Sequence, residues 1–134
     1  MLNMETVMTY SFENIIAWEK AHSLVLLTYI ITRHFPEDEK FGLTSQFRRA
    51  AVSIEANIAE GYKKLSKTDK LRFFNIAQGS LEECRDYHIL SRDLGYITSE
   101  EFESLHQSIE ETSRFLNSYC KAIVNDVAMK DNKP

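Results

Sequence analysis

The chain has 134 residues, which suffices for one domain with a hydrophobic core and leaves no room for a second. With 43% hydrophobic and 27% charged residues, four glycines and two prolines, its composition excludes a disordered or collagen-like chain and favours a compact helical protein. A formal net charge of −4 excludes the overall basic excess of a free-standing nucleic-acid-binding protein, so such binding has to be local.

Cysteine usage and hydropathy bear on where the protein resides. Cys84 and Cys120 are too few and too far apart for a disulfide scaffold or a thiolate zinc site, which favours a reducing, cytoplasmic environment. The N-terminal residues contain no basic stretch followed by an apolar one, so no secretory signal is expected. The most apolar run, residues 24–31, is too short to span a bilayer, and we expect no membrane partner.

Proline and glycine punctuation divides the chain into four helical segments. The first, residues 13–34, ends before Pro36 because the residue preceding a proline is pushed out of the α region. The second begins after Thr44 or Ser45, either of which can cap the free amides, and ends near Gly61. Its apolar positions recur at helical spacing on one face: Leu43, Phe47, Ala50, Ile54 and Ile58.

Capping boxes mark the starts of the third and fourth helices. The third begins at Ser66, with Asp69 three residues later, and runs to Leu94 with Gly95 as its stop. Its predicted inward face consists of Phe73, Ala77, Ser80, Cys84, Tyr87, His88 and Ser91. The fourth begins at Thr98, and its predicted inward stripe is Phe102, Leu105, Ile109, Thr112, Leu116, Cys120, Ile123 and Val127.

Four helices joined by short loops predict an all-α fold, an antiparallel up-down four-helix bundle over residues 13–126. Residues 1–12 are predicted to form an N-terminal arm, and residues 127–134 a disordered polar tail. The first helix is apolar around its whole circumference between residues 24 and 31, whereas each helix of a small bundle has an outer face. We therefore predict a homo-oligomer, the alternative being tolerated surface aliphatic residues. The predicted contact face is Leu24, Leu26, Leu27, Ile30 and Ile31.

Some residues have the spacing of catalytic or metal sites. Glu-x-x-His pairs at residues 19–22 and 103–106 match those of di-iron bundles, but the helical phase turns both glutamates outward, which favours solvated carboxylates. Cys84 and His88 fall on an inward face, which favours a buried thiol beside a hydrogen-bonded core histidine over a nucleophile and its base. We found no glycine-rich phosphate loop or Ser-His-Asp set, so we expect no enzyme activity, metal, cofactor or small-molecule substrate.

Polar residues recur at three- and four-residue steps along the flank of the second helix. They are Gln46, Arg49, Ser53, Asn57 and Glu60, and Glu83 on the third helix is a candidate partner for Arg49. Because this series mixes both charge signs with neutral groups, it suits a hydrogen-bonded network between helices or subunits better than a phosphate-binding strip.

Basic residues cluster around the turn between the second and third helices. They are Lys63, Lys64, Lys67, Lys70 and Arg72, with Asp69 as the one acidic residue among them, and Arg48 is a lesser candidate for extending the cluster. Solvated lysines are the simplest interpretation, but such clustering is also the electrostatic footprint that RNA binding requires. We predict that these six residues are the candidate nucleic-acid contacts, which neutralise phosphates rather than recognise bases.

Three segments of the sequence carry a resemblance to a known family. They are F-E-N-I-I-A-W-E-K-A at residues 12–21, H-F-P-E-D-E-K-F-G-L-T-S-Q-F-R-R-A-A-V-S-I-E-A-N-I-A-E-G at residues 34–61, and F-N-I-A-Q-G-S-L-E-E at residues 74–83. The chain resembles the bacterial four-helix-bundle proteins encoded in 23S rRNA intervening sequences, from Phe12 to about Val124. This resemblance implies an up-down bundle assembled into a ring-shaped homopentamer, without enzyme activity. A similar bundle is the accessory protein of diversity-generating retroelements, which binds a reverse transcriptase and nucleic acid.

The resemblance also places a polar motif on this sequence, with no catalytic constellation in it: Gln46, Arg49, Ser53, Asn57, Glu60, Gly61, Gly79, Ser80 and Glu83. The relatives that bind nucleic acid are strongly basic, whereas this chain is net acidic, which favours weak or partner-dependent binding. The leading hypothesis is a non-catalytic homo-oligomer, associated with RNA or with a nucleic-acid-processing protein. The alternative is a protein-binding helical scaffold with no nucleic-acid role, and a bundle metalloenzyme is a remote third.

Overall fold

The structure is a computed structural model that describes residue 12 and residues 15–131. Four long helices make up most of it: α2 (Ile16–Thr32), α3 (Leu43–Lys63), α4 (Lys67–Asp93) and α5 (Ser99–Asp131). A short 3-10 helix, η2 (Glu37–Glu39), lies between α2 and α3. No strand occurs in this part of the chain, so the predicted all-α fold with four long helices is confirmed. Residues 1–11 of the predicted N-terminal arm lie outside the described residues.

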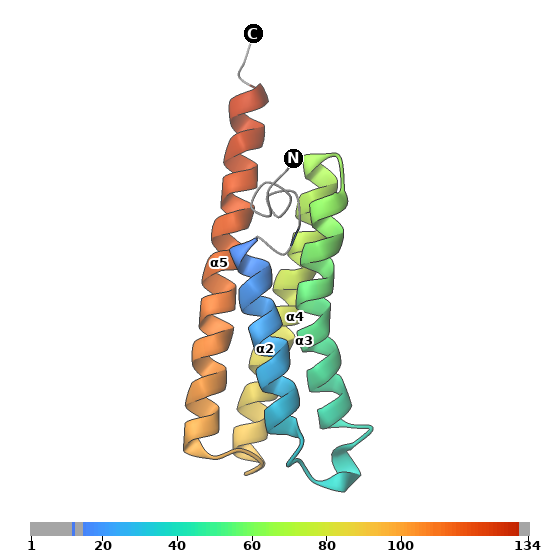
Figure 1. Ribbon diagram of the computed structural model, residues 1–134, viewed down its shortest axis with the longest axis vertical. Coiled ribbons are helices and arrows are strands. Elements are labelled where there is room, and N and C mark those ends of the chain that lie inside the picture. The colour runs from blue at the N-terminus through green and yellow to red at the C-terminus, as the bar shows by residue number, and fades with distance from the viewer. Residues whose placement is uncertain (1–11, 13–14, 132–134) are drawn as a thin grey trace, which may run out of the picture.

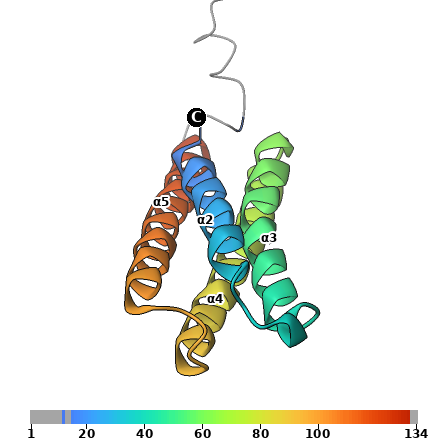
Figure 2. The ribbon, with the colours of Figure 1, turned by 60° about the horizontal axis from the view of Figure 1, so that its bottom comes forward.

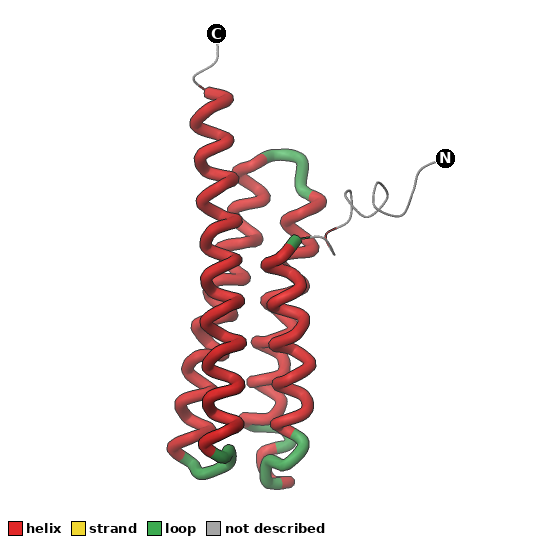
Figure 3. The backbone as a smooth tube through the Cα atoms, turned by 60° about the vertical axis from the view of Figure 1, so that its left-hand side comes forward, coloured by secondary structure: helices red, strands yellow, loops and turns green. Residues whose placement is uncertain are grey.

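The helices lie side by side with alternating chain direction (Figure 1). Each packs against the next one in sequence, and α5 packs against α2, which closes the bundle. In Figure 2, α2 lies between α5 and α3. The α2–α3 and α4–α5 connections lie at one end of the bundle and the α3–α4 turn at the other (Figure 3).

The ends of α4 and α5 follow the predicted capping signals. The Ser66 hydroxyl accepts a hydrogen bond from the Asp69 amide at 3.1 Å. At α5, the Thr98 hydroxyl accepts from the Glu101 amide at 3.1 Å, and the Glu101 carboxylate accepts from the Thr98 amide at 2.8 Å, which is a complete capping box. Gly95 ends α4 with φ of +76°, a left-handed conformation that glycine adopts without steric cost.

The predicted cap of α3 is wrong. The helix begins at Leu43, so Thr44 and Ser45 lie inside it. The N-cap residue is Gly42, which has no side chain that could accept a hydrogen bond from the first amides of the helix. Instead, the Glu39 carboxylate of η2 accepts a hydrogen bond from the Leu43 amide at 3.1 Å. A carboxylate at this position also interacts favourably with the positive end of the helix dipole.

The outer bounds of the bundle differ from the prediction at both ends. α2 begins at Ile16 and ends at Thr32, two residues short of the predicted end, and Glu13 lies outside the described residues. α5 continues to Asp131, into the segment predicted as a disordered tail. Residues 127–131 contain good helix formers and neither glycine nor proline, so the sequence provides no stop at residue 127.

The core face of α4 is shifted by one residue from the prediction at its start. Phe74 is fully buried, with its ring edge-on to Tyr119 at 5.2 Å, whereas Phe73 is only partly buried. Buried positions continue at alternating steps of three and four residues through Ala77, Leu81, Cys84, His88 and Ser91. This spacing keeps side chains on the stripe that faces the other helices, and Phe73 falls beside it.

The predicted oligomer face of α2 is wrong at two of its five positions. Leu24 is 0% exposed and Ile31 is 4% exposed, so both belong to the core of the subunit. Leu26 and Ile30 are 53% and 51% exposed, and Leu27 is partly buried. The buried face of this helix includes small and polar residues that a hydropathy pattern does not identify. Thr28, for example, is buried and donates its hydroxyl to the Leu24 carbonyl at 2.7 Å.

Candidate functional site

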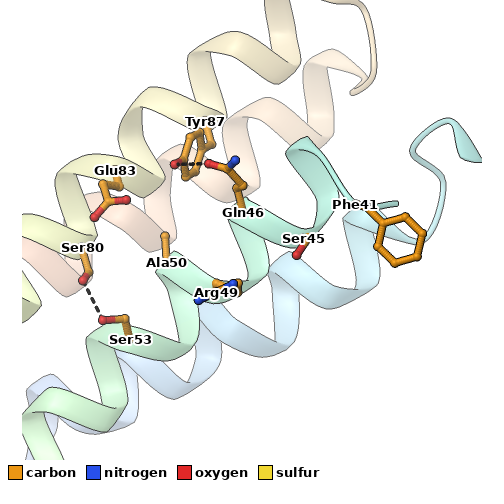
Figure 4. A pocket seen from close by; sticks show the side chains of 9 residues that line it. All are labelled: Phe41, Ser45, Gln46, Arg49, Ala50, Ser53, Ser80, Glu83 and Tyr87. Atoms are coloured by element: carbon orange, nitrogen blue, oxygen red, sulfur yellow. Dashed lines mark hydrogen bonds between the residues drawn. The ribbon is translucent and has the colours of Figure 1, made fainter. Parts of the chain in front are cut away.

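A polar pocket of about 310 Å³ lies in the groove between α3 and α4 (Figure 4). On one wall, α3 contributes Ser45, Gln46, Arg49, Ala50 and Ser53. On the other, α4 contributes Ser80, Glu83 and Tyr87, and Phe41 joins them from the connection before α3. The pocket brings together four residues of the predicted polar series: Gln46, Arg49, Ser53 and Glu83.

Two hydrogen bonds cross the groove at the ends of the pocket. The hydroxyl oxygens of Ser53 and Ser80 lie 2.8 Å apart, and the Tyr87 hydroxyl donates to Gln46 Oε1 at 3.0 Å. The partners are seven residues apart on each helix, which is about 10 Å along the axis. Ala50 lies between the two hydrogen bonds in Figure 4 and carries only a methyl group, which leaves the hollow.

Arg49 and Glu83 bring opposite charges to this pocket but form no ion pair. Their side chains are exposed and belong to opposite walls, and none of the salt bridges among the described residues includes either of them. The predicted Arg49–Glu83 pair is therefore absent from the described part of the chain. Burial, followed by the negative charges of Glu83 and Asp86, raises the pKa of the Tyr87 phenol. A phenol is protonated at neutral pH even at its ordinary pKa, so the Tyr87 hydroxyl is a hydrogen-bond donor there.

The other two members of the polar series lie outside the pocket. The Asn57 amide donates to the Ser53 carbonyl at 2.8 Å and to the Ser53 hydroxyl at 3.1 Å, which extends the network by one turn. Glu60 lies further along α3, with its carboxylate 3.5 Å from the Lys64 ammonium. The hydrogen bonds of the series therefore form two separate groups, Asn57–Ser53–Ser80 and Gln46–Tyr87.

The predicted basic cluster lies at the α3–α4 turn, at the opposite end of α3 from the pocket. Lys63 is exposed. Lys64 and Arg72 both approach the Phe73 ring, with distances of 4.9 Å and 5.4 Å to its centroid. Arg72 also lies 3.5 Å from the Asp69 carboxylate, and Lys67 forms an ion pair with Asp126 of α5. Most of these cations thus already have an acidic or aromatic neighbour.

Lys70 has a structural role in this cluster. Its ammonium donates to the Tyr62 carbonyl at 2.6 Å and to the Gly61 carbonyl at 3.4 Å, groups at the end of α3 where carbonyls lack helical partners. Burial lowers the pKa of this ammonium. Lys70 therefore joins the end of α3 to the start of α4.

Arg48 does not extend the basic cluster. It is fifteen residues from Lys63 on α3, about 22 Å along the axis. Its guanidinium donates to the Thr32 hydroxyl at 2.8 Å and lies 4.6 Å from the Tyr29 ring centroid. Arg48 thus belongs to the α2–α3 face, and the prediction that placed it with the lysines is corrected.

The remaining sequence hypotheses concern metal binding and thiol chemistry. In the part of the chain that the structure describes, no group of three or more His, Cys, Asp or Glu residues could hold a metal ion, and Glu19 and Glu103 are exposed. Burial and the Glu83 charge raise the pKa of the Cys84 thiol to about 12. His88 is 2% exposed, and its Nε2 lies 2.8 Å from the Phe102 carbonyl oxygen. The predicted buried thiol beside a hydrogen-bonded core histidine is confirmed.

A helix that crosses a membrane has to be both long and predominantly apolar. Among the described residues, no helix combines the length and apolar character needed to cross a membrane.

Comparison with known proteins agrees with the fold. The family model of the 23S rRNA-intervening sequence protein matches residues 13–118, and the chain belongs to this family. The chain is also similar to the crystal structure of a protein of unknown function from the S23 ribosomal protein family of Bacteroides thetaiotaomicron VPI-5482. The TM-score is 0.72 at 26% sequence identity, over 79% of this chain and 96% of that one. No curated protein matches significantly.

Several pocket residues were not part of the predicted polar series. Tyr87 was predicted to face inward, yet its hydroxyl reaches the groove and bonds to Gln46. Ser45 was predicted only as a helix cap, and Phe41 had no predicted role. The Gln46–Tyr87 contact spans 41 residues of sequence, so only the packing of α3 against α4 reveals it.

Proposed function

We propose that this protein is a non-catalytic, homo-oligomeric accessory factor that associates with RNA at the α3–α4 turn. The observation that carries the proposal is the group of cations at this turn, Lys63, Lys64, Lys67 and Arg72, in a chain with a net charge of −4. Membership of a family named for an intervening sequence of 23S rRNA agrees with an RNA partner.

The mechanism is neutralisation of phosphates by the cations of this turn, of which Lys63 and Arg72 are exposed and Lys64 and Lys67 are partly buried. Lys64 and Arg72 pair with acidic residues one turn away at 3.5 Å, and such surface pairs contribute little to stability. A phosphate can therefore take the place of either carboxylate at small cost. Both cations also lie over the Phe73 ring, which keeps them close together at the turn. Affinity should accordingly fall with salt and depend little on sequence.

Self-association is the second part of the proposal, and an apolar surface across α2 and α3 supports it. Leu26, Tyr29, Ile30 and Val52 are 53%, 39%, 51% and 38% exposed, and Arg48 covers one face of the Tyr29 ring. Exposed apolar side chains grouped on neighbouring helices are typical of a contact between proteins. The number of subunits, five, comes from the family resemblance. A ring would repeat the basic turn around its axis, so that several weak contacts act on one RNA.

RNA binding is tested with a structured RNA titrated against wild-type protein at several salt concentrations. The triple variant Lys63→Gln, Lys64→Gln, Arg72→Gln should weaken binding at least tenfold. Each phosphate contact contributes about 0.7 to the slope of log K against log salt concentration, so the loss of three contacts should make this slope shallower by about 2. A matched control, Arg33→Gln, Lys40→Gln, Arg114→Gln, changes the net charge equally and should bind like wild type. Equal binding by both variants, or no binding by wild type at low salt, refutes RNA association.

Self-association is tested by sedimentation. Wild type should sediment as an oligomer at micromolar concentration, and Leu26→Glu with Ile30→Glu should dissociate it while the helical content is retained, because both side chains are exposed in the subunit. A monomeric wild type contradicts the oligomer. An oligomer that binds no RNA favours the alternative of a protein-binding scaffold.

A further inference from the structure

The pocket between α3 and α4 is separate from the surfaces that the proposed function uses. Arg49 and Lys63 are fourteen residues apart on α3, about 21 Å along the axis. The walls of the pocket are already held in place by the Ser53–Ser80 and Gln46–Tyr87 hydrogen bonds. A polar, accessible hollow with charged groups is a candidate for binding a small ligand.

The charges of this pocket are available to a ligand. Arg49 and Glu83 line the same 310 Å³ space, and neither forms a salt bridge within the described residues. The Arg49 guanidinium offers paired N–H donors with the geometry that a carboxylate accepts. The Glu83 carboxylate, which lies close enough to the Tyr87 phenol to raise its pKa, can also accept from an ammonium group. A bound molecule could therefore provide the oppositely charged partner that each of these two side chains lacks.

The combination of charges restricts the class of ligand. A phosphate or dicarboxylate on Arg49 would be repelled by Glu83, and a simple cation on Glu83 would be repelled by Arg49. A molecule with one negative and one positive group satisfies both. The volume of about 310 Å³ is at the small end for ligand pockets, which favours a small ligand.

We propose that the pocket binds a small zwitterion of the α-amino acid class, with its carboxylate on Arg49 and its ammonium on Glu83. The Gln46 amide and the Ser45 hydroxyl are further hydrogen-bonding groups on the α3 wall. Phe41 is 88% exposed and also lines the pocket, so an apolar ligand side chain gains contact area against its ring. Amino acids with apolar side chains should therefore bind more tightly than glycine.

The proposal is tested by titrating the twenty amino acids into ¹⁵N-labelled protein, up to about 10 mM, which detects millimolar affinity. At least one apolar amino acid should shift the amide signals of the pocket residues. Its analogue without the amino group and its analogue without the carboxylate should each bind at least tenfold more weakly, because each loses one charged hydrogen bond.

Variants separate the pocket from general charge effects. Glu83→Gln and Arg49→Gln should each weaken binding about tenfold or more. Glu82→Gln and Arg33→Gln change the net charge equally outside the pocket and should bind like wild type. Phe41→Ala should reduce the preference for apolar side chains and leave glycine binding unchanged.

The proposal is overturned if no amino acid binds, if the deaminated analogue binds as tightly as the amino acid, or if Glu83→Gln is without effect while the protein stays folded. RNA titrations with the same pocket variants distinguish the two sites. Loss of amino-acid binding with unchanged RNA binding assigns the ligand to the pocket, whereas failure of the RNA experiment leaves the amino-acid result unaffected.

Discussion

Gly61, in the last turn of α3, is buried against aromatic residues at the start of α4. A Cβ at this position would lie 2.7 Å and 3.0 Å from Cε1 and Cδ1 of Phe74, and 3.1 Å from Cβ of Phe73. The Phe74 ring is fully buried and lies edge-on to Tyr119 at 5.2 Å, so it has little room to move. Gly61→Ala should therefore force a rearrangement between α3 and α4.

Two opposing effects determine the size of this change. Overpacking a core position costs about 1–3 kcal/mol, whereas alanine in a helix is about 1 kcal/mol more favourable than glycine. We expect Gly61→Ala to destabilise the protein by about 1 kcal/mol, as the difference of these two effects. Gly79 of α4 is the matched control, because nothing lies within 4 Å of a Cβ built there. Gly79→Ala should stabilise the protein by about 0.5–1 kcal/mol.

Urea unfolding followed by circular dichroism, at one fixed protein concentration, measures both free energies. Phe74→Leu removes the ring that the new methyl group meets, so Gly61→Ala should be neutral or stabilising in that background. The resulting double-mutant cycle should give a coupling free energy of about 1–2 kcal/mol. If Gly61→Ala stabilises wild type as much as Gly79→Ala does, or if the coupling is below about 0.5 kcal/mol, the inferred contact is wrong.

Further predictions concern titration, reactivity and capping. Burial lowers the pKa of His88 from its ordinary value of 6.5. Its contribution to the free energy of unfolding should therefore be lost as pH falls below about 6.5. The variant His88→Gln should reduce the pH dependence of this free energy between pH 7.5 and 5. In a Cys120→Ser background, thiol reagents at about pH 8 should modify Cys84 only as fast as the protein unfolds, whereas rapid labelling contradicts its burial. Thr98→Ala removes one half of the α5 capping box and should cost about 1 kcal/mol in thermal or urea unfolding, while Ser99→Ala should cost less.

Much of the fold follows from local sequence. The Ser66 and Thr98 caps and the Gly95 stop depend on contacts within one turn, so residue spacing alone predicts them. The α3 cap was not predictable in this way, because the carboxylate of Glu39 belongs to a separate 3-10 helix. Glu39 and Leu43 are only four residues apart, but the capping-box pattern requires a polar side chain at the N-cap position, and that position is occupied by Gly42.

The candidate sites also combine features that are visible in the sequence with contacts that only the folded chain creates. The sequence by itself determined the polar spacing of α3 and the cluster of lysines at the α3–α4 turn, because both are periodic or contiguous along the chain. Only the tertiary structure decided that Tyr87 bonds to Gln46, that Arg49 and Glu83 share a pocket without pairing, and that Arg48 packs on Tyr29. The physical reason is that these contacts depend on the register and rotation of neighbouring helices, which are set by how the buried side chains of the whole core fit together.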